Sequence, residues 1–371
     1  MKKILFVTPD LIAGGAQRQL INMVNGFHEK GYEVSVFMFY DKGELRDFLH
    51  ENVKTFFPPS VSIIKRSRFL WVIHGTIKLF RIAMSEKPDI IYSRQWPIIP
   101  IAFIGRILKI KTVSVEINSL EHSLLLPKRR LLFLTRRLCA RLSDKVVANS
   151  KSLAAEVKEV FGLSSEVKVI YNGIDTEDIR KKSEEKQEHK WFGTGTPVIL
   201  AMGYFKKSDQ KGFSYLLEAL EIVNRTKTVR LIILGRGKRE NLENLSKKLS
   251  IADKTDFISA VPNPFTYVSN ADIFVCSSIY EGLSNVVLEA MALGKPVIST
   301  DHKHGANEII ENKKSGILVP IANPKSIADA IIKILDDEEL RRKLGEEAKK
   351  KSEYFSKNKM LSRYEKLFGE M

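Results

Sequence analysis

The chain has 371 residues, 44% of them hydrophobic and 28% charged, a composition typical of a soluble globular protein with two domains. Its 60 lysines and arginines outnumber its 44 acidic residues, and the formal charge of +16 predicts an anionic partner: a nucleic acid, an anionic lipid surface or a phosphorylated substrate. Cys139 and Cys276 indicate neither a disulfide framework nor a zinc site and suit a reducing cytosol, and no apolar segment reaches the roughly 18 residues of a membrane span.

The amino-terminal residues 4–7 form a short apolar run, and similar runs recur along the chain with helical stretches between them. The others are residues 34–39, 90–92, 112–115, 146–148, 167–170, 198–202, 231–234, 273–276 and 297–299. This alternation predicts an α/β fold, with parallel sheets covered by helices on both faces. In such folds ligands bind beyond the carboxyl ends of the strands.

Gly14 and Gly15 follow the first run and precede an amphipathic helix. Glycines at this point let a ligand approach the backbone closely, although a plain tight turn is the alternative. Their spacing is not that of the G-x-G-x-x-G fingerprint, so a nicotinamide cofactor is not supported.

Two stretches of the amino-terminal half, residues 65–87 and 128–141, interleave basic and apolar side chains. This pattern is typical of helices on an anionic bilayer surface, and equally of packed helices with snorkelling arginines. Between them, Glu116, Asn118 and His122 follow the run 112–115, at a strand's carboxyl end where a site is expected.

Residues 180–190 are highly charged without apolar periodicity and predict a solvated linker. We therefore expect a first domain over residues 1–172, a linker over 173–196 and a second domain over 197–354. A helix at about 355–371 is expected to pack back on the first domain.

The most informative stretch is residues 279–300. Ser284 or Asn285 can cap a helix of about nine residues that ends before Gly294. The first amides of this helix make a site for an anion such as a diphosphate, with Glu281 just before them and Glu289 about a turn further along. Two acids beside an anion site suit a nucleotide-sugar, whereas singly each glutamate would pass for a solvated surface residue.

Loops after other strands of the second half carry lysines and glycines that could hold phosphates, including Lys206, Lys211, Gly235 and Arg236. His302 and His304 could form a metal pair, but no acidic partner stands at ligand spacing. The sequence therefore predicts no metal site.

Taken together, these loops resemble glycosyltransferase family 4, the retaining nucleotide-sugar enzymes of GT-B fold, over nearly the whole chain. The most specific match is the pair Glu281 and Glu289, separated by seven residues as in the family motif. Further matches are Gly14-Gly15-Ala16, Asn172-Gly173-Ile174-Asp175, Gln210-Lys211-Gly212, Gly305 with Glu308-Ile309-Ile310, and residues 312–320. Residues 114–119 are similar to a loop of members that build bacterial polysaccharides or lipid-linked glycans.

The resemblance implies two Rossmann-like domains, the second for a nucleotide-sugar donor, most simply a UDP-sugar, and the first for an acceptor. By comparison, Glu281 would contact the donor sugar, Glu289 the ribose, and Lys211 the diphosphate. Tyr204 stands where the family often has arginine, and Lys206 or Lys207 is the expected replacement. The remaining expected contacts to the donor are Gly15, Gly235, Arg236, Val261, Leu283, Ser284 and Asn285, and those to the acceptor are Arg18, Glu116, Asn118 and His122.

The resemblance thus implies a retaining hexosyltransferase of surface polysaccharide synthesis, without cofactor or divalent metal. It would work in the cytoplasm, with peripheral contact to the inner face of the cell membrane through residues 65–87 and 128–141. Two alternatives stay open: an epimerase or hydrolase acting on sugar nucleotides with the same fold, and a basic nucleic-acid-binding protein. Against the latter, the chain has no binding-module signature, and its basic residues alternate with aliphatic rather than exposed aromatic side chains.

Overall fold

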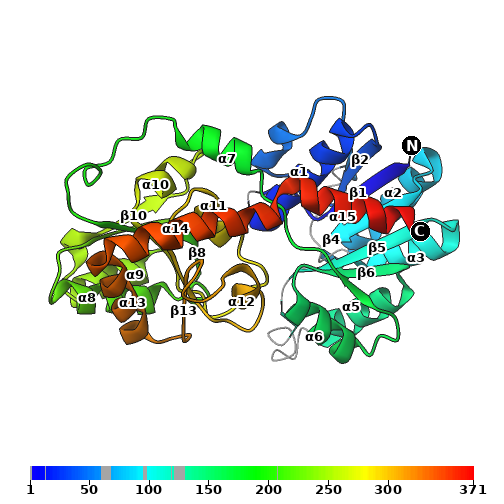
Figure 1. Cartoon of the computed structure of the whole chain (residues 1–371). Coiled ribbons are helices and arrows are strands. Elements are labelled where there is room, and N and C mark those ends of the chain that lie inside the picture. The colour runs from blue at the N-terminus through cyan, green and yellow to red at the C-terminus, as the bar shows by residue number, and fades with distance from the viewer. Residues whose placement is uncertain are drawn as a thin grey trace. The chain divides into compact units, whose positions relative to one another are not determined.

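The computed structural model describes residues 2–12, 14–59, 68–94, 98–117, 119–120, 130–206 and 208–371. The chain forms two compact units (Figure 1). The first comprises Met1–Gly173 together with Lys357–Met371, and the second comprises Ile174–Ser356. Each unit is built on one parallel sheet with helices packed against it.

The first unit contains a seven-stranded parallel sheet in the order β3-β2-β1-β4-β5-β6-β7. Its strands are β1 (Lys3–Thr8), β2 (Glu33–Met38), β3 (Lys54–Phe56), β4 (Ile90–Arg94), β5 (Lys111–Glu116), β6 (Lys145–Ala148) and β7 (Val167–Val169). Its helices are α1 (Gly15–Glu29), η1 (Glu44–Phe48), α2 (Arg68–Glu86), α3 (Ile98–Leu108), α5 (Arg130–Leu142), α6 (Lys151–Phe161) and α15 (Lys357–Gly369).

Alternate residues of β1 enter two different cores, because successive side chains of a strand point to opposite faces of the sheet. Ile4 and Phe6 pack with side chains of α1 and of the carboxyl-terminal helix α15. Leu5 and Val7 pack with side chains of α2 and α3 on the other face. The sheet is therefore buried on both faces, which is why its strands read as continuous apolar runs.

The second unit contains a six-stranded parallel sheet in the order β10-β9-β8-β11-β12-β13. Its strands are β8 (Val198–Phe205), β9 (Arg230–Gly237), β10 (Thr255–Ser259), β11 (Ile273–Cys276), β12 (Val297–Thr300) and β13 (Ile317–Val319). Its helices are α7 (Thr176–Ser183), α8 (Phe213–Asn224), α9 (Glu240–Lys248), η4 (Ala252–Lys254), α10 (Phe265–Asn270), α11 (Asn285–Ala292), α12 (Ala306–Ile309), α13 (Pro324–Asp336), α14 (Glu338–Ser352) and η5 (Glu353–Phe355).

All ten apolar runs form strands, and the sequence missed three further strands, β3, β10 and β13. Each of these lies at an outer edge of its sheet. An edge strand is only partly covered, and accordingly β3 and β10 are largely half-buried or exposed. β3 and β10 lack the apolar runs by which a central strand is found, whereas β13 is a run of three apolar residues.

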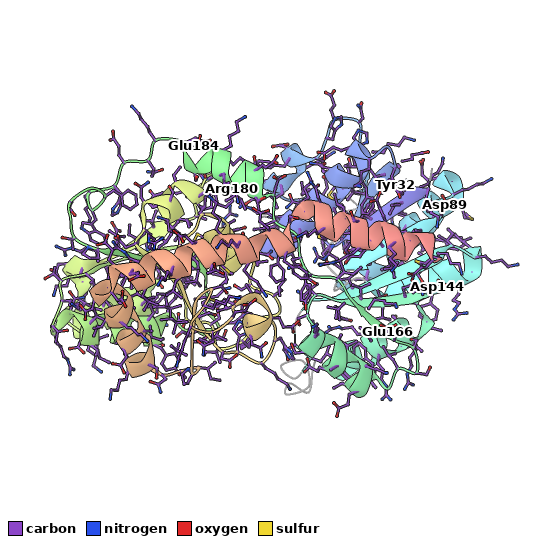
Figure 2. The ribbon with its side chains drawn as sticks, in the orientation of Figure 1. Tyr32, Asp89, Asp144, Glu166, Arg180 and Glu184 are labelled. Atoms are coloured by element: carbon purple, nitrogen blue, oxygen red, sulfur yellow. The ribbon has the colours of Figure 1, made fainter. Side chains whose placement is uncertain are left out.

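The residues expected as a linker, 173–196, differ from that expectation. Residues 174–196 belong to the second unit, and α7 within them packs against α10 and α11. Arg180 of α7, labelled in Figure 2, forms an ion pair of 2.6 Å with Glu353. The Asn263 side chain donates to the Lys182 carbonyl over 2.8 Å. Of the charges that suggested a solvated linker, Arg180, Lys181 and Lys182 belong to the short helix α7, in which Ile179 is buried.

Aspartate side chains accept hydrogen bonds from backbone amides at the amino ends of several strands. The Asp89 carboxylate accepts from the Lys3 amide over 2.7 Å, and the Asp144 carboxylate accepts from the Thr112 amide over 2.9 Å (Figure 2). In the second sheet, Asp272 accepts from the Val198 amide over 2.8 Å. Side chains thus satisfy amides at the amino edge, whereas the loops with glycines, lysines and glutamates leave from the carboxyl edge.

Candidate active site

In the second sheet, the order in which the chain adds strands reverses at β8. The chain leaves β8 for β9 on one side, and β11 pairs with the other side of β8. In open α/β sheets, ligands bind at such a switch point, in a crevice beyond the carboxyl ends of the strands. The loop 206–212 follows β8 and the loop 277–284 follows β11, so this topology brings together two of the motifs found in the sequence.

Three hydrogen bonds hold these two loops together. The Ile279 amide donates to the Gln210 carbonyl over 2.9 Å, and the Gln210 side chain donates to the Tyr280 carbonyl over 3.1 Å. The Ser277 hydroxyl donates to the Lys211 carbonyl over 2.8 Å. The backbone of Lys211 is therefore fixed against the exit of β11.

Two glycines make room for this arrangement. Gly212 has a φ of +61°, and a Cβ there would lie 2.0 Å from the Ser277 carbonyl oxygen. At Gly203 in β8, a Cβ would lie 2.9 Å from two carbons of the Lys211 side chain. The aliphatic part of Lys211 can therefore lie directly on the strand, which carries its ammonium toward the neighbouring loop.

The Lys211 ammonium forms a close ion pair with the Glu281 carboxylate, in which the same Oε1 accepts from the Ser278 hydroxyl over 2.9 Å. The two charged side chains are only 16% and 14% exposed. Burial raises the pKa of Glu281, but the charge and hydrogen bond of Lys211 outweigh it and hold that pKa below its ordinary value. For Lys211, burial lowers the pKa and Glu281 raises it, with a net rise. Both groups are therefore charged at neutral pH.

His302, which follows β12, is the third titratable group of this cluster. It is 2% exposed and interacts electrostatically with both Glu281 and Lys211. Burial lowers the pKa of His302 below its ordinary value, so the imidazole is neutral at pH 7. Gly305 closes the loop over the site, since a Cβ there would lie 2.6 Å from the Gly282 carbonyl oxygen. In the described part of the chain, no three His, Cys, Asp or Glu side chains gather as a metal site.

Helix α11 begins at Asn285, as expected, with Ser284 at the N-cap position. The Ser284 hydroxyl makes no capping hydrogen bond and lies 3.8 Å from the Cys276 sulfur instead. Leu283 is buried beneath this turn, and Glu289 is half-buried one turn along the helix. The positive end of α11 thus lies between Glu281 and Glu289, an arrangement that suits an anionic ligand.

The other residues expected around the donor follow strands of the same sheet. The exposed Lys206 follows β8 and donates to the Gln210 side chain over 2.7 Å, whereas Lys207 lies outside the described residues. Gly235 and the exposed Arg236 lie near the end of β9, and Val261 follows β10. All four lie at the carboxyl edge, where Lys211 and Glu281 meet.

In the first unit, Gly15 begins α1 and the half-buried Arg18 lies in its first turn, where the Arg18 amide donates to the Gly14 carbonyl over 2.9 Å. Glu116 differs from expectation. Its carboxylate is fully buried and forms a close ion pair with Arg136 of α5, so it binds within the unit instead of facing an acceptor. Asn118 and His122 lie outside the described residues.

Sequence reasoning missed several residues that shape these sites. Ser277 and Ser278 hold Lys211 and Glu281, and their place directly after a buried strand was the available signal. Arg94, at the carboxyl end of β4, is 7% exposed and donates to the Asn172 side chain over 2.7 Å. No local pattern connects Arg94 with Asn172, because 78 residues of sequence separate them.

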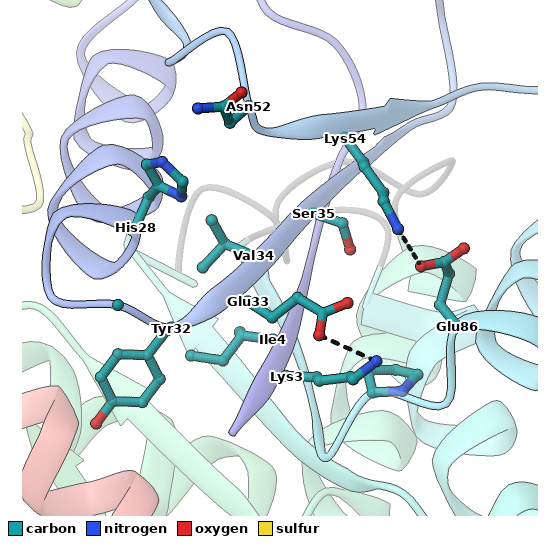
Figure 3. Close-up of a pocket in the computed structure, with 12 residues that line it drawn as sticks. Lys3, Ile4, His28, Tyr32, Glu33, Val34, Ser35, Asn52, Lys54 and Glu86 are labelled. Atoms are coloured by element: carbon teal, nitrogen blue, oxygen red, sulfur yellow. Dashed lines mark hydrogen bonds and ion pairs between the residues drawn. The ribbon is translucent and has the colours of Figure 1, made fainter. Parts of the chain in front are cut away.

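A cavity of about 180 Å³ lies elsewhere, at the amino ends of β1 and β2 (Figure 3). Its lysines are already paired: Lys3 with Glu33 over 3.0 Å and Lys54 with Glu86 over 3.4 Å. It lies at the edge opposite to that where α/β sheets bind ligands. We therefore assign the candidate site to the carboxyl edge.

Known protein families match both halves of the chain. The family model described as glycosyl transferases group 1 matches residues 181–351, and the model described as glycosyltransferase family 4 matches residues 13–178. Together they cover most of both units.

Curated relatives include an uncharacterised glycosyltransferase of Methanocaldococcus jannaschii, 30% identical over 94% of this chain and 93% of its own length. A lipopolysaccharide core biosynthesis glycosyltransferase, LpsE of Rhizobium meliloti, is 29% identical over 90% of this chain and 89% of its own. A Campylobacter jejuni N-acetylgalactosaminyltransferase, named for a diphospho-undecaprenol-linked substrate, is 31% identical over 59% of this chain and 58% of its own length.

Among solved structures, Anabaena HepE in complex with UDP superposes with a TM-score of 0.80 and covers all of both chains, at 20% identity. This likeness concerns the fold. The matches to both family models and the relative aligned over almost its whole length show that the chain belongs to glycosyltransferase family 4 and has the GT-B fold.

Proposed function

We propose that this glycosyltransferase moves a sugar from a UDP-sugar to a hydroxyl of a glycan or lipid-linked acceptor in surface polysaccharide synthesis, with retention at the anomeric carbon. The observation that carries the proposal is the buried pair of Lys211 and Glu281 beside the start of α11. It offers a cation and helix amides to a diphosphate, and a carboxylate to the hydroxyls of a sugar. HepE, of the same fold, has been solved with UDP and with UDP-glucose.

In the structure, the Lys211 charge is neutralised by Glu281. A donor diphosphate beside the first turn of α11 would share the ammonium and leave a Glu281 oxygen to accept from a sugar hydroxyl. As the bond to the leaving phosphate breaks, negative charge grows on its oxygen, where the amides and Lys211 are already oriented. Such preorganised donors are a main source of catalysis in group transfer.

The acceptor hydroxyl would attack from the face that the nucleotide leaves, and a leaving phosphate oxygen would take its proton. Glu281 is unsuited to serve as a base, because its lowered pKa keeps it a weak one. Glu289 would bind the ribose hydroxyls. This assignment needs neither a carboxylate nucleophile nor a separate general base.

The direct test is a thermal-shift screen of UDP-, GDP- and ADP-sugars, followed by transfer assays with the donor that stabilises the protein. A ligand at one hundred times its dissociation constant stabilises the folded state by about 2.7 kcal/mol. We expect UDP-sugars to raise the melting temperature, and NMR of the product to show the anomeric configuration of the donor. An inverted product would refute the retaining mechanism, and donor conversion without acceptor would favour an epimerase or hydrolase.

We also propose that turnover needs no divalent metal, because Lys211 and the α11 amides would offset the diphosphate charge. Full activity in excess EDTA is the expected result. Loss of activity in EDTA that is restored by Mg²⁺ or Mn²⁺ would show that the role given to Lys211 is wrong.

A lipid-linked acceptor would hold its reacting sugar close to the membrane. We therefore include, in the proposal, a cytoplasmic location with peripheral contact to the inner face of the cell membrane. Arg18 and Gly15, at the start of α1, are the described residues assigned to the acceptor side and to the facing end of the donor, respectively.

A further inference from the structure

The side chain of Arg94 carries a buried positive charge at the carboxyl edge of the first sheet. Arg94 is the last residue of β4 and is only 7% exposed. Its Nη2 donates to the Asn172 side chain over 2.7 Å, but its buried Nε and Nη1 have no hydrogen-bond partner in the described part of the chain. Because buried polar groups are nearly always paired, these two nitrogens point to a partner that the chain itself does not supply.

No acidic side chain among the residues that the structure describes forms an ion pair with Arg94. Glu116, at the end of the neighbouring strand β5, is already paired with Arg136. Arg94 interacts electrostatically with Tyr92 and Tyr364, whose hydroxyls lie 3.3 Å from each other. Burial raises the pKa of both tyrosines, so both are neutral at pH 7 and neither offsets the charge of the guanidinium.

The hydrogen bond to Asn172 does not require a charged donor. A neutral amide side chain at position 94 could donate to the same oxygen without bringing a charge into the interior, where an unpaired charge is costly. An arginine offers five N–H donors in one plane, and this arrangement matches two oxygens of a carboxylate or a phosphate. Since Asn172 accepts from only one nitrogen, the remaining donors of Arg94 suit an oxyanion.

Arg94 lies at the position where an open α/β sheet binds its ligands. In the first sheet the chain adds β2 and β3 on one side of β1, and β4 then pairs with the other side (Figure 1). Ligands bind at such a reversal, beyond the carboxyl ends of the strands. Ser93 pairs with Val7 of β1, so Arg94 lies beside the point where the chain leaves β1.

The start of α1 adds positive charge to the same edge. Gln19 of α1 accepts from the Gly173 amide over 3.1 Å, which holds the first turns of the helix beside Asn172. The first turn contains no acidic residue, and its half-buried Arg18 pairs with none of the described acids. The amino end of a helix itself carries a partial positive charge. Arg94, Arg18 and the end of α1 therefore make this edge favourable for an anion.

We propose that Arg94 binds an oxyanion of the acceptor, and hence that the acceptor of this glycosyltransferase carries a phosphate or a carboxylate. The inference rests on the proposed function, in which an acceptor binds to the first unit. Two sources supply this chemistry: the diphosphate of a lipid-linked sugar, or the carboxylate of an acidic sugar in a glycan. Either anion would accept charged hydrogen bonds from the donors that Asn172 leaves unused.

The test is calorimetric titration of the full chain with three soluble probes: glucose 1-phosphate, glucuronate and the neutral methyl glucoside. The protein is first saturated with UDP, so that the anion site at the start of α11 is filled. We expect an anionic probe to bind at least about tenfold more tightly than the neutral one. Tighter binding of glucose 1-phosphate would indicate a lipid-linked diphosphate sugar, and tighter binding of glucuronate an acidic sugar.

Three variants separate the charge of Arg94 from its structural contact. Arg94→Gln can still donate to Asn172 but is neutral, and it should weaken binding of the anionic probe roughly tenfold to a hundredfold. Arg94→Lys keeps the charge without the planar fork and should have an intermediate affinity. The matched control is Arg141→Gln, which removes an exposed arginine that donates to the carbonyls of Phe161 and Gly162. It should bind the probe as the wild type does.

The affinity for UDP should be the same in Arg94→Gln and in the wild type, because the proposed donor site lies on the second unit. Repeating the titrations without UDP in Lys211→Met tests the anion site even if the donor is not a UDP-sugar. Failure of the proposed donor would therefore be seen separately. Binding of neither anionic probe, unchanged affinity in Arg94→Gln or an equal loss in Arg141→Gln would overturn the proposal. A lower melting temperature of Arg94→Gln with unchanged anion affinity would likewise show that Arg94 only supports Asn172.

Discussion

The ion pair of Lys211 and Glu281 allows a quantitative test. Glu281→Gln keeps the size of the side chain and can still accept from Ser278, but it leaves the Lys211 charge without its partner. Lys211→Met removes the ammonium and leaves the Glu281 carboxylate without its partner. Removing one partner of a fully buried pair costs about 3 to 5 kcal/mol, and a charged hydrogen bond contributes about 1.5 to 3 kcal/mol. Since these side chains retain 16% and 14% exposure, we expect each single change to cost about 2 to 3 kcal/mol.

The double variant should cost about as much as either single one, because it leaves no uncompensated charge. The coupling energy from the cycle would then be about 2 kcal/mol or more. Urea unfolding followed by circular dichroism measures it, and in a unit of this size each kcal/mol corresponds to roughly 2 to 4 °C of melting temperature. Lys343→Met with Glu339→Gln, an exposed pair of α14, is the matched control and should show no resolvable coupling.

Measurements of kcat and of UDP binding distinguish the role of Lys211 from that of Glu281. Lys211→Met should lower kcat roughly a hundredfold to a thousandfold, because it removes a donor aimed at the leaving phosphate. Glu281→Gln should retain binding of UDP, with Lys211 free for the diphosphate, and lose most turnover. Stability changes that simply add to within about 0.5 kcal/mol, or near wild-type kcat in both variants, would refute this account of the pair.

Three further predictions concern other positions. Glu289→Ala should weaken UDP binding at least tenfold by calorimetry while leaving stability within about 1 kcal/mol, and unchanged affinity would exclude the ribose role. Gly212→Ala should lower the melting temperature and activity together, because a Cβ there meets the Ser277 carbonyl oxygen; a wild-type melting curve would contradict this. Burial raises the pKa of Asp144, but hydrogen bonds from Thr112 and Lys111 outweigh this effect and hold the pKa below its ordinary value. The contribution of Asp144 to the free energy of unfolding should therefore be present above about pH 4 and vanish as pH falls through the lowered pKa. The difference in unfolding free energy between wild type and Asp144→Asn, measured against pH, should therefore shrink in acid, and a constant difference would argue against the linkage.

Much of the fold could be predicted from the sequence because burial leaves a local trace. A central strand of a parallel sheet is covered on both faces, so its apolar run is legible without knowing its neighbours. The edge strands β3 and β10 are partly exposed and left no such trace, whereas the short apolar run of β13 was overlooked. The segment 174–196 was misjudged for a related reason: its surface helix α7 is mostly charged, and only its packing on α10 and α11 shows that it belongs to the second unit.

Some features of the candidate site could likewise be predicted from the sequence, and others depended on the tertiary structure. The sequence by itself determined that Glu281 precedes a short helix, that Glu289 lies within it, and that Lys211 follows a strand, because caps, glycines and strand ends are local signals. Only the tertiary structure decided that Lys211 and Glu281 form a buried pair, since strand order brings β8 beside β11 across seventy residues of chain. It also turned Glu116 inward to Arg136. Local patterns fix the kind of side chain and the element that carries it, whereas the partner and the exposure of that side chain depend on packing between distant segments.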